Sequence, residues 1–204
     1  CPVGGSKVMN EVAKRLGYST PEHEPTVAVL HCNGTCENAP DKVEYIGLQS
    51  CRLANRAFVG KTGCPNGCLR LGDCVRNCPF GAIEMDDQTG LPRVNPDKCT
   101  SCGACVRICP RGLYEIRPRG KNGVMVYVAC SNKQKGATAR KNCKAACIAC
   151  MKCTKICPEV TVEENLSRIP PSVSAKLYGA ELAAGCPTGA IVYTGAKGDK
   201  NEQN

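Results

Sequence analysis

Cys99-Thr-Ser-Cys102-Gly-Ala-Cys105-Val-Arg-Ile-Cys109-Pro110 is the stretch of the sequence that indicates the fold most directly. Four cysteines and a proline at these offsets are typical of [4Fe–4S] ligands: three closely spaced thiolates hold one cluster, and the fourth reaches the other cluster of a pair. A zinc ribbon would instead use two separated C-x2-C pairs without the trailing Cys-Pro. The run therefore predicts a protein built around paired iron–sulfur clusters.

A stretched version of the pattern precedes this run, as Cys64-x3-Cys68-x5-Cys74-x3-Cys78-Pro79. Exchange of the fourth ligands between the two runs predicts two cluster sites. The site with regular spacing uses Cys78, Cys99, Cys102 and Cys105. In the other site Leu71 occupies the expected middle position, so Cys64 has to stand in beside Cys68, Cys74 and Cys109.

The same plan recurs in the second half of the chain. Cys-Pro followed by a turn and a short strand is expected four times, starting at Cys78, Cys109, Cys157 and Cys186. A third site, again with regular spacing, is expected from Cys147, Cys150, Cys153 and Cys186. The answering run has lost its three cysteines to Lys176, Gly179 and Leu182, so we expect that cluster to be absent and Cys157 to be a buried free thiol.

A further group, Cys32-x3-Cys36-x14-Cys51, supplies three thiolates and needs a fourth. Cys51-x12-Cys64-x3-Cys68 recurs as Cys130-x12-Cys143-x3-Cys147, which makes Cys130 the expected fourth ligand and Cys143 the alternative. The joint prediction is four [4Fe–4S] clusters on the chain. His31, beside Cys32, could ligate a cluster or have a structural or surface role.

Composition favours metal over disulfide bonds. Nineteen cysteines in 204 residues would suit a small disulfide scaffold, but their number is odd and their spacing is of the cluster type. Only two Phe and no Trp are present, so we expect the clusters to replace much of the usual apolar core. No segment is apolar over the roughly 18 residues that a membrane span requires.

Lys and Arg outnumber Asp and Glu, 27 to 18. A basic surface favours an acidic partner and steers its approach. Nucleic acid is not expected as a partner, because the cations are spread along the chain without a basic run or interleaved aromatics. The cations beside the cluster motifs are the expected docking charges: Arg70, Arg76, Arg107, Arg111, Lys152 and Lys155.

Four segments together resemble one known family. They are Cys1-Pro-Val-Gly-Gly with the stretch that follows it, His31-Cys-Asn-Gly-Thr-Cys36, Ser50-Cys-Arg-Leu-Ala-Asn55 and Gly63-Cys-Pro-Asn-Gly-Cys68. Over essentially its whole length the chain resembles the B subunit of the Rnf complex, in the long, cluster-rich form of anaerobes. The resemblance implies that Cys1 completes one more cluster with residues upstream, and that a transmembrane helix precedes them.

The resemblance also implies a function. The Rnf complex is a membrane-bound ferredoxin:NAD+ oxidoreductase that exports Na+ or H+, and its B subunit relays electrons from soluble ferredoxin. We therefore expect an electron-transfer subunit at the cytoplasmic face of the membrane, with ferredoxin and the other subunits as partners. No Gly-rich dinucleotide fingerprint or acid–base constellation is present, so no complete active site is expected. The alternatives are a soluble polyferredoxin subunit of a hydrogenase or other oxidoreductase, and a zinc-bound interaction module.

The predicted fold class is α+β, with tandem bacterial-type ferredoxin-like units whose short strands and helices wrap around the clusters. We expect a first unit over 64–118 and a second, degenerate unit over 119–195. The remaining segments are the end of an N-terminal iron–sulfur domain (1–24), a segment with extra ligands (25–63) and a polar tail (196–204). A helix is expected over 6–17, capped by Ser6 and ended by Gly17, and a strand over 26–31.

Overall fold

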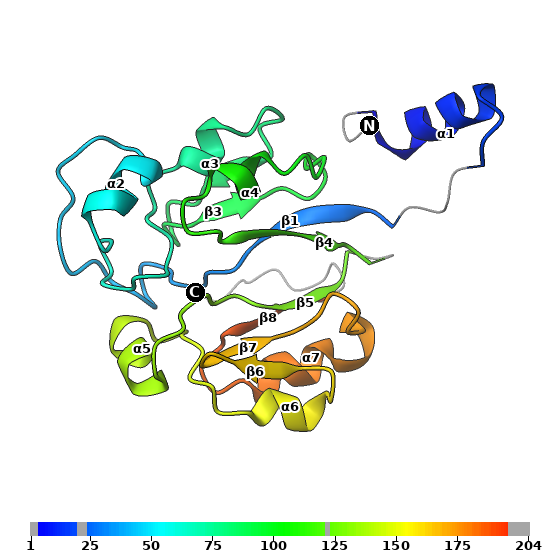
Figure 1. The fold of residues 1–204 in the computed structure, drawn as a ribbon. Helices are drawn as coiled ribbons and strands as arrows, with labels where there is room; N and C mark the ends of the chain where they lie inside the picture. The colour runs from blue at the N-terminus through cyan, green and yellow to red at the C-terminus, as the bar shows by residue number, and fades with distance from the viewer. Residues whose placement is uncertain (1–3, 20–23, 121–122, 196–204) are drawn as a thin grey trace.

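The computed structural model describes the chain except for residues 1–3, 20–23, 121–122 and 196–204 (Figure 1). Cys1 and the expected polar tail therefore lie outside the described residues. The elements in chain order are α1 (Gly5–Arg15), β1 (Thr26–Leu30), α2 (Cys51–Ala57), α3 (Asp73–Arg76), β2 (Ile83–Met85), β3 (Pro92–Val94), α4 (Ala104–Ile108), β4 (Tyr114–Pro118), β5 (Met125–Val128), α5 (Gly136–Asn142), α6 (Lys152–Ile156), β6 (Thr161–Glu163), β7 (Leu166–Arg168), α7 (Ala175–Gly185) and β8 (Ile191–Thr194).

The strands form four antiparallel two-stranded sheets in the described residues. β1 pairs with β4 and β2 with β3, and in the second half β5 pairs with β8 and β6 with β7. In each half the first and last strands along the sequence thus pair with each other, and the two strands between them form the second pair. Figure 1 shows the two halves as separate bodies, with β4 and β5 along the boundary between them. The mixture of short helices and strands agrees with the predicted α+β class.

The Cys-Pro pairs set the element boundaries. α4, α6 and α7 each end at the residue before a Cys-Pro pair, because proline has no amide N–H and cannot continue a helix. A strand follows each of the four pairs, as predicted: β2, β4, β6 and β8. The chain therefore turns sharply at every such cysteine, which leaves the thiol at the bend.

The expected N-terminal helix is present as α1, and the expected strand before Cys32 is present as β1. The N-cap of α1 is Gly4 and not Ser6, because Ser6 already lies within the first turn. Gly17 follows the helix with φ +75°, the left-handed conformation that glycine adopts most easily after a helix. Among the helices that the structure describes, none combines the length and apolarity needed to cross a membrane.

The second half has an apolar core at the place where the answering run has lost its cysteines. Leu182 and Cys157 are both fully buried in this core. Gly179 lies against the ring of Tyr193, so closely that a Cβ on this residue would be 2.3 Å from Cδ2 of the tyrosine. Leucine, glycine and a tyrosine ring therefore occupy space between α7 and β8.

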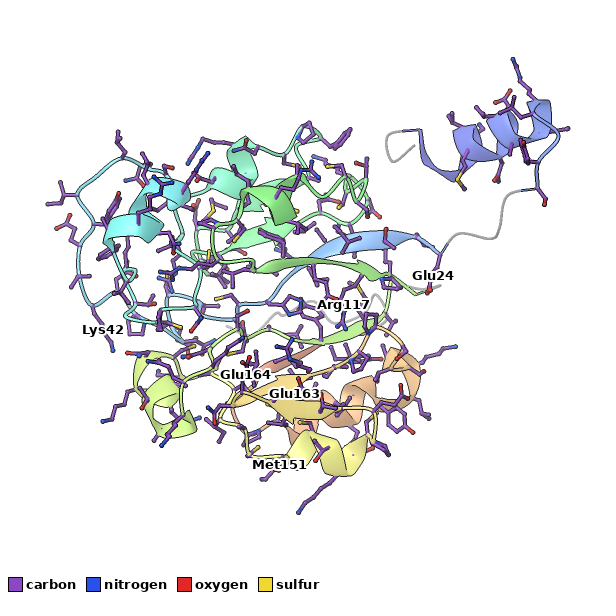
Figure 2. All side chains as sticks on the ribbon, viewed as in Figure 1. Glu24, Lys42, Arg117, Met151, Glu163 and Glu164 are labelled. Carbon is purple, nitrogen blue, oxygen red and sulfur yellow. The ribbon has the colours of Figure 1, made fainter. Side chains whose placement is uncertain are left out.

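Arg117 of β4 joins the two halves (Figure 2). Its side chain is only 4% exposed. One guanidinium nitrogen, Nη1, donates to the carbonyl of Val126 at 3.0 Å, and the other, Nη2, donates to the carbonyl of Ile169. The carboxylate of Glu115 lies 3.5 Å from Nε. A single buried cation thus binds backbone carbonyls of the second half from a strand of the first.

His31 reinforces the same boundary. Its Nδ1 lies 2.7 Å from the carbonyl of Val128, and its Nε2 lies 2.8 Å from Glu115 Oε2. Both ring nitrogens are therefore engaged, which assigns His31 a structural role. Further along the boundary, Lys42 Nζ donates to Oδ1 of Asn142 at 2.7 Å.

Replacement of Arg117 tests this joint. In Arg117→Ala the carbonyls of Val126 and Ile169 lose a buried donor, so we expect the free energy of unfolding to fall by roughly 1–3 kcal/mol. Arg168→Ala is the control, because that side chain is 51% exposed and should change the same quantity by less than about 0.5 kcal/mol. Anaerobic urea unfolding of the reconstituted protein measures both, and equal losses would contradict this role.

Candidate iron–sulfur cluster sites

Four cavities in the described residues are lined by cysteines that come together from distant parts of the chain. We name them sites A to D. Site A contains Cys78, Cys99, Cys102 and Cys105; site B contains Cys51, Cys68, Cys74 and Cys109; site C contains Cys32, Cys64, Cys130 and Cys143; site D contains Cys147, Cys150, Cys153 and Cys186.

Sites A and D bring together the sets that the sequence predicted. In each, a short loop takes two left-handed residues: Ser101 and Gly103 in site A, with φ of 56° and 73°, and Ala149 and Met151 in site D, with φ of 54° and 60°. Non-glycine residues adopt this conformation at a cost that the surrounding structure must offset. The repeated strain shows that both loops are bent in one way, which turns their three cysteines towards a common cavity.

Site B uses the same loop with one substitution. Arg70 and Gly72 are left-handed, with φ of 59° and 76°, at the positions that Ser101 and Gly103 occupy in site A. Leu71, at the place of the middle cysteine, is buried. The cavity is completed by Cys51, whereas the expected stand-in, Cys64, lines the neighbouring cavity of site C.

The start of α2 explains how Cys51 reaches site B. Ser50 caps this helix by accepting a hydrogen bond from the amide of Leu53. Asp73, in the ligand loop, accepts from the amide of Arg52 at 3.0 Å and from the hydroxyl of Ser50 at 3.3 Å. The carboxylate thereby fixes the first turn of α2, and Cys51 with it, against the loop.

Site C draws one pair of cysteines from each half. Cys32 follows β1 and Cys130 follows β5, while Cys64 and Cys143 each precede a ligand loop by the same C-x3-C spacing. Of the expected set Cys32, Cys36, Cys51 and Cys130, only Cys32 and Cys130 share this cavity. The other two cysteines that line the cavity, Cys64 and Cys143, occupy equivalent positions in the internal repeat. That equivalence is the sequence signal that could have identified them.

Cys36 lies outside all four cavities. It is exposed, and its amide donates to the carbonyl of Thr89 at 2.9 Å. Its Sγ lies 3.7 Å from Nη1 of Arg70 and presses against Gly90, where a Cβ would be 2.6 Å away. The short loop after Cys32 therefore directs the second thiol towards the 86–90 turn and away from site C.

The donor sets fit [4Fe–4S] clusters. Among the described residues, no three Cys, His, Asp or Glu side chains converge closely enough to hold a single metal ion. A cubane carries its four thiolates on four separate iron atoms, so its ligands surround a cavity, as they do in sites A to D. The four cysteine sulfurs of a zinc site would instead each lie about 2.3 Å from the same metal ion.

Backbone amides point at the sulfur atoms. Seven such N–H···S contacts fall between 3.3 and 3.5 Å; the donor–acceptor pairs are Ala82–Cys78, Leu113–Cys109, Cys68–Cys32, Arg70–Cys68, Asn132–Cys130, Cys147–Cys130 and Ser167–Cys147. Hydrogen bonds of this kind stabilise an anionic sulfur. The backbone is therefore arranged for thiolates rather than for thiols.

Comparison with known proteins gives the same picture. Residues 62–113 match the model of the 4Fe-4S dicluster domain. Over 193 residues the chain is 42% identical to the B subunit of the proton-translocating ferredoxin:NAD(+) oxidoreductase complex of Clostridium ljungdahlii and to that of the Na(+)-translocating complex of Acetobacterium woodii. It is 36% identical to the B subunit of the ion-translocating oxidoreductase complex of Methanosarcina acetivorans. In all three comparisons 94% of this chain is aligned.

This chain belongs to the Rnf B-subunit family. It spans 71% of the length of the Methanosarcina protein, and 66% and 56% of the Clostridium and Acetobacterium proteins. The resemblance inferred from the sequence is thus confirmed.

Burial opposes ionisation of several ligands in this member of the family. It raises the pKa of Cys130 to about 12 and that of Cys105 to about 11. At neutral pH these metal-free thiols are therefore protonated, and iron has to displace their protons. Loading of these sites with iron would therefore release protons.

Two hydroxyl groups lie within 3.5 Å of a cysteine sulfur of these sites. The buried Tyr114 donates from Oη to Cys74 Sγ of site B at 3.4 Å. In site D, the Ser167 hydroxyl lies 3.2 Å from Cys153 Sγ. Neither residue was identified from the sequence, since nothing in a strand pattern distinguishes a tyrosine or serine that faces a sulfur.

The expected docking arginines are partly internal. Arg70 Nη2 donates to the carbonyls of Gly34 and Ala39, and its side chain is 7% exposed. Arg111 donates from Nη1 to the carbonyl of Cys64 at 3.1 Å. These guanidinium groups support sites B and C, whereas Lys152 and Lys155 are exposed.

The pair Cys32 and Cys36 offers a matched test of site C. Because only Cys32 lines the cavity, Cys32→Ala should lower the iron content by about four atoms per chain, and Cys36→Ala should leave it unchanged. Cys143→Ala should behave like Cys32→Ala. Iron and acid-labile sulfide analysis of the three variants decides the point. Equal iron loss in Cys36→Ala, or none in Cys143→Ala, would show that the ligand set is different.

Tyr114→Phe tests the hydroxyl contact at site B. Without this donor the more negative, reduced state loses a hydrogen bond of about 1 kcal/mol, equivalent to about 40 mV for one electron. We expect one midpoint potential to fall by that amount at unchanged iron content, as measured by a redox titration followed by electron paramagnetic resonance. Tyr18→Phe, at a side chain that is 73% exposed, should leave all potentials unchanged. A titration of Tyr114→Phe identical to that of the parent would refute the contact.

Proposed function

We propose that the chain is an electron-transfer module that holds four [4Fe–4S] clusters, one in each of sites A to D. The observation that carries this proposal is the convergence of sixteen cysteines around four cavities, each lined by at least four of them, with Cys68 lining two. When bound, such clusters supply one-electron redox chemistry. The chain's own contribution is to hold the thiolates in place and to present amide and hydroxyl donors to them. No catalytic residue is proposed.

We infer that the chain consists of two ferredoxin-like units in tandem. The pairing of β1 with β4 and of β5 with β8 supports units over 26–118 and 125–194. The first unit then includes β1, which the sequence had assigned to a separate segment over 25–63. Site C lies between the units, because each unit supplies two of its cysteines.

The sites follow one another in the order A, B, C, D. Ligands of A and B belong to one core, in which Cys74 and Cys105 are buried together. Cys68 of site B lines the cavity of site C as well, and its amide donates to Cys32 Sγ. The amide of Cys147 of site D donates to Cys130 Sγ of site C. We propose that electrons travel along this series, with A and D at its ends.

The donor and destination are proposed from the relatives. The Clostridium and Acetobacterium proteins are named as subunits of ferredoxin:NAD(+) oxidoreductase complexes, one translocating protons and the other Na(+). We propose that this chain relays electrons from reduced ferredoxin to a membrane-bound, NAD-reducing, ion-translocating complex. It would associate with the cytoplasmic face of the membrane through other subunits, and Cys1 would hold a fifth cluster together with upstream residues.

Anaerobic reconstitution tests the proposal. We expect about 16 iron and 16 acid-labile sulfide per chain, and a visible absorption that bleaches with dithionite and with reduced ferredoxin. About 8 of each would leave only two sites loaded, and zinc in place of iron would support the interaction module. Bleaching by dithionite alone would refute ferredoxin as the donor.

A further inference from the structure

A long stretch of the sequence around site D contains no Asp or Glu. Between Glu115 and Glu159 there is no Asp or Glu, although ten Lys and Arg occur there. Seven of these are exposed on α5, on α6 and on the segments before and between them, and one of the seven, Lys133, is paired with Glu164. We call the other six the basic surface: Lys135, Arg140, Lys141, Lys144, Lys152 and Lys155. None of the ion pairs in the described residues involves any of the six.

Two of the four acidic residues of the same unit are already paired with cations outside the basic surface. Glu164 binds Lys133 at 2.5 Å, and Glu163 lies 3.7 Å from Arg168. The positive charge of the basic surface therefore remains available to a partner. Electrostatic steering by such a patch raises association rates with an acidic protein.

Site D reaches the molecular surface at this place. Cys150 is an exposed ligand, whereas Cys102, its equivalent in site A, is only partly exposed. The neighbouring Met151 is 55% exposed and points outward from the lower body in Figure 2. The cations around site A are also mixed with acids, since Lys98 follows Asp97 and Arg93 pairs with Asp86.

We propose that the basic surface docks an acidic electron-carrier protein, and that its electrons enter the chain at site D. This inference rests on the electron-transfer function proposed above. A transient carrier is favoured over a permanent subunit, because this surface is mostly polar. Among its described residues, Met151 is the one large apolar side chain that is exposed. Exposed apolar residues gather instead over 43–59, at Val43, Ile46, Leu48, Leu53 and Val59. Obligate interfaces are apolar, while transient electron-transfer contacts are small and polar.

Charge reversal tests the docking surface. The reconstituted Lys152→Glu/Lys155→Glu variant is mixed with a reduced acidic two-cluster ferredoxin in a stopped-flow instrument, and bleaching is followed over a salt series. We expect the second-order rate constant to fall about tenfold at low salt. The difference should shrink towards 1 M salt, where the screening length is about 3 Å. Because Lys152 adjoins a ligand, Lys135→Glu/Arg140→Glu on the same surface should show the same effect without contact with site D.

Two control variants carry the same change in net charge. Lys7→Glu/Lys14→Glu alters exposed lysines of α1, away from both bodies in Figure 1, and Lys98→Glu/Arg107→Glu alters the surroundings of site A. Both should keep at least half of the parent rate. Iron content and bleaching by dithionite confirm that every variant is loaded.

The outcomes separate the two proposals. A fall in the rate constant confined to Lys98→Glu/Arg107→Glu would show that ferredoxin docks at site A. Equal falls in all variants would show that net charge, and not one surface, determines the rate. Unchanged rates in both variants of the basic surface, with normal reduction by ferredoxin, would overturn the docking surface alone. Failure of ferredoxin to reduce the parent protein, while dithionite reduces it, would overturn the proposed function itself.

Discussion

Site C is the constraint on which the rest of the structure depends. Its four thiols come from both halves, Cys32 and Cys64 from one and Cys130 and Cys143 from the other. The protein contacts across this boundary include the hydrogen bonds of Arg117 and His31, and a small apolar cluster in which Ala39 of the first half packs with Ala139, Ala145 and Ala146 of the second. On either side, cysteines pack in a core with larger apolar residues, such as Ile83 and Tyr114 in the first half and Leu182 and Ile191 in the second. A cluster in site C would join the two units through their cysteines in addition to these contacts, as structural metals do in small domains.

The same site has a second consequence in the proposed electron-transfer series, where it stands between site B and site D. A change that opens site C separates A and B from D in electron transfer and weakens the joint between the units at the same time. A substitution of Cys32 or Cys130 therefore cannot separate the effect on stability from the effect on electron transfer. Residues that touch sulfur without ligating metal, such as Tyr114, are better probes of function, since their hydroxyl can be removed while the fold and the ligand set are kept.

The sequence was sufficient for local features and insufficient for long-range ones. Regular C-x2-C-x2-C spacing predicts sites A and D because one loop conformation holds three of the four ligands. For site B, where Leu71 stands at the place of the middle cysteine, the sequence predicted Cys64 as the stand-in, whereas Cys51 lines this cavity in the structure because Asp73 fixes the start of α2 beside it. Cys36 was assigned to a cluster by proximity to Cys32, but a short loop can direct two thiols apart. Spacing cannot determine such pairings, because they depend on how distant segments pack.

The distribution of cations follows the burial of the sites. Arg111 interacts electrostatically with Cys64, Cys68 and Cys109, and Arg70 with Cys143, so guanidinium groups lie beside the interior sites B and C. Arginine suits this position because its planar fork donates to several carbonyls while it remains charged. Around the exposed site D the cations are mainly lysines, which are strongly hydrated and mobile on the surface. The basic excess of the chain is thus divided: partly buried arginines lie where they can offset the negative charge of interior thiolates, and the exposed lysines are the charges that we propose attract an acidic partner.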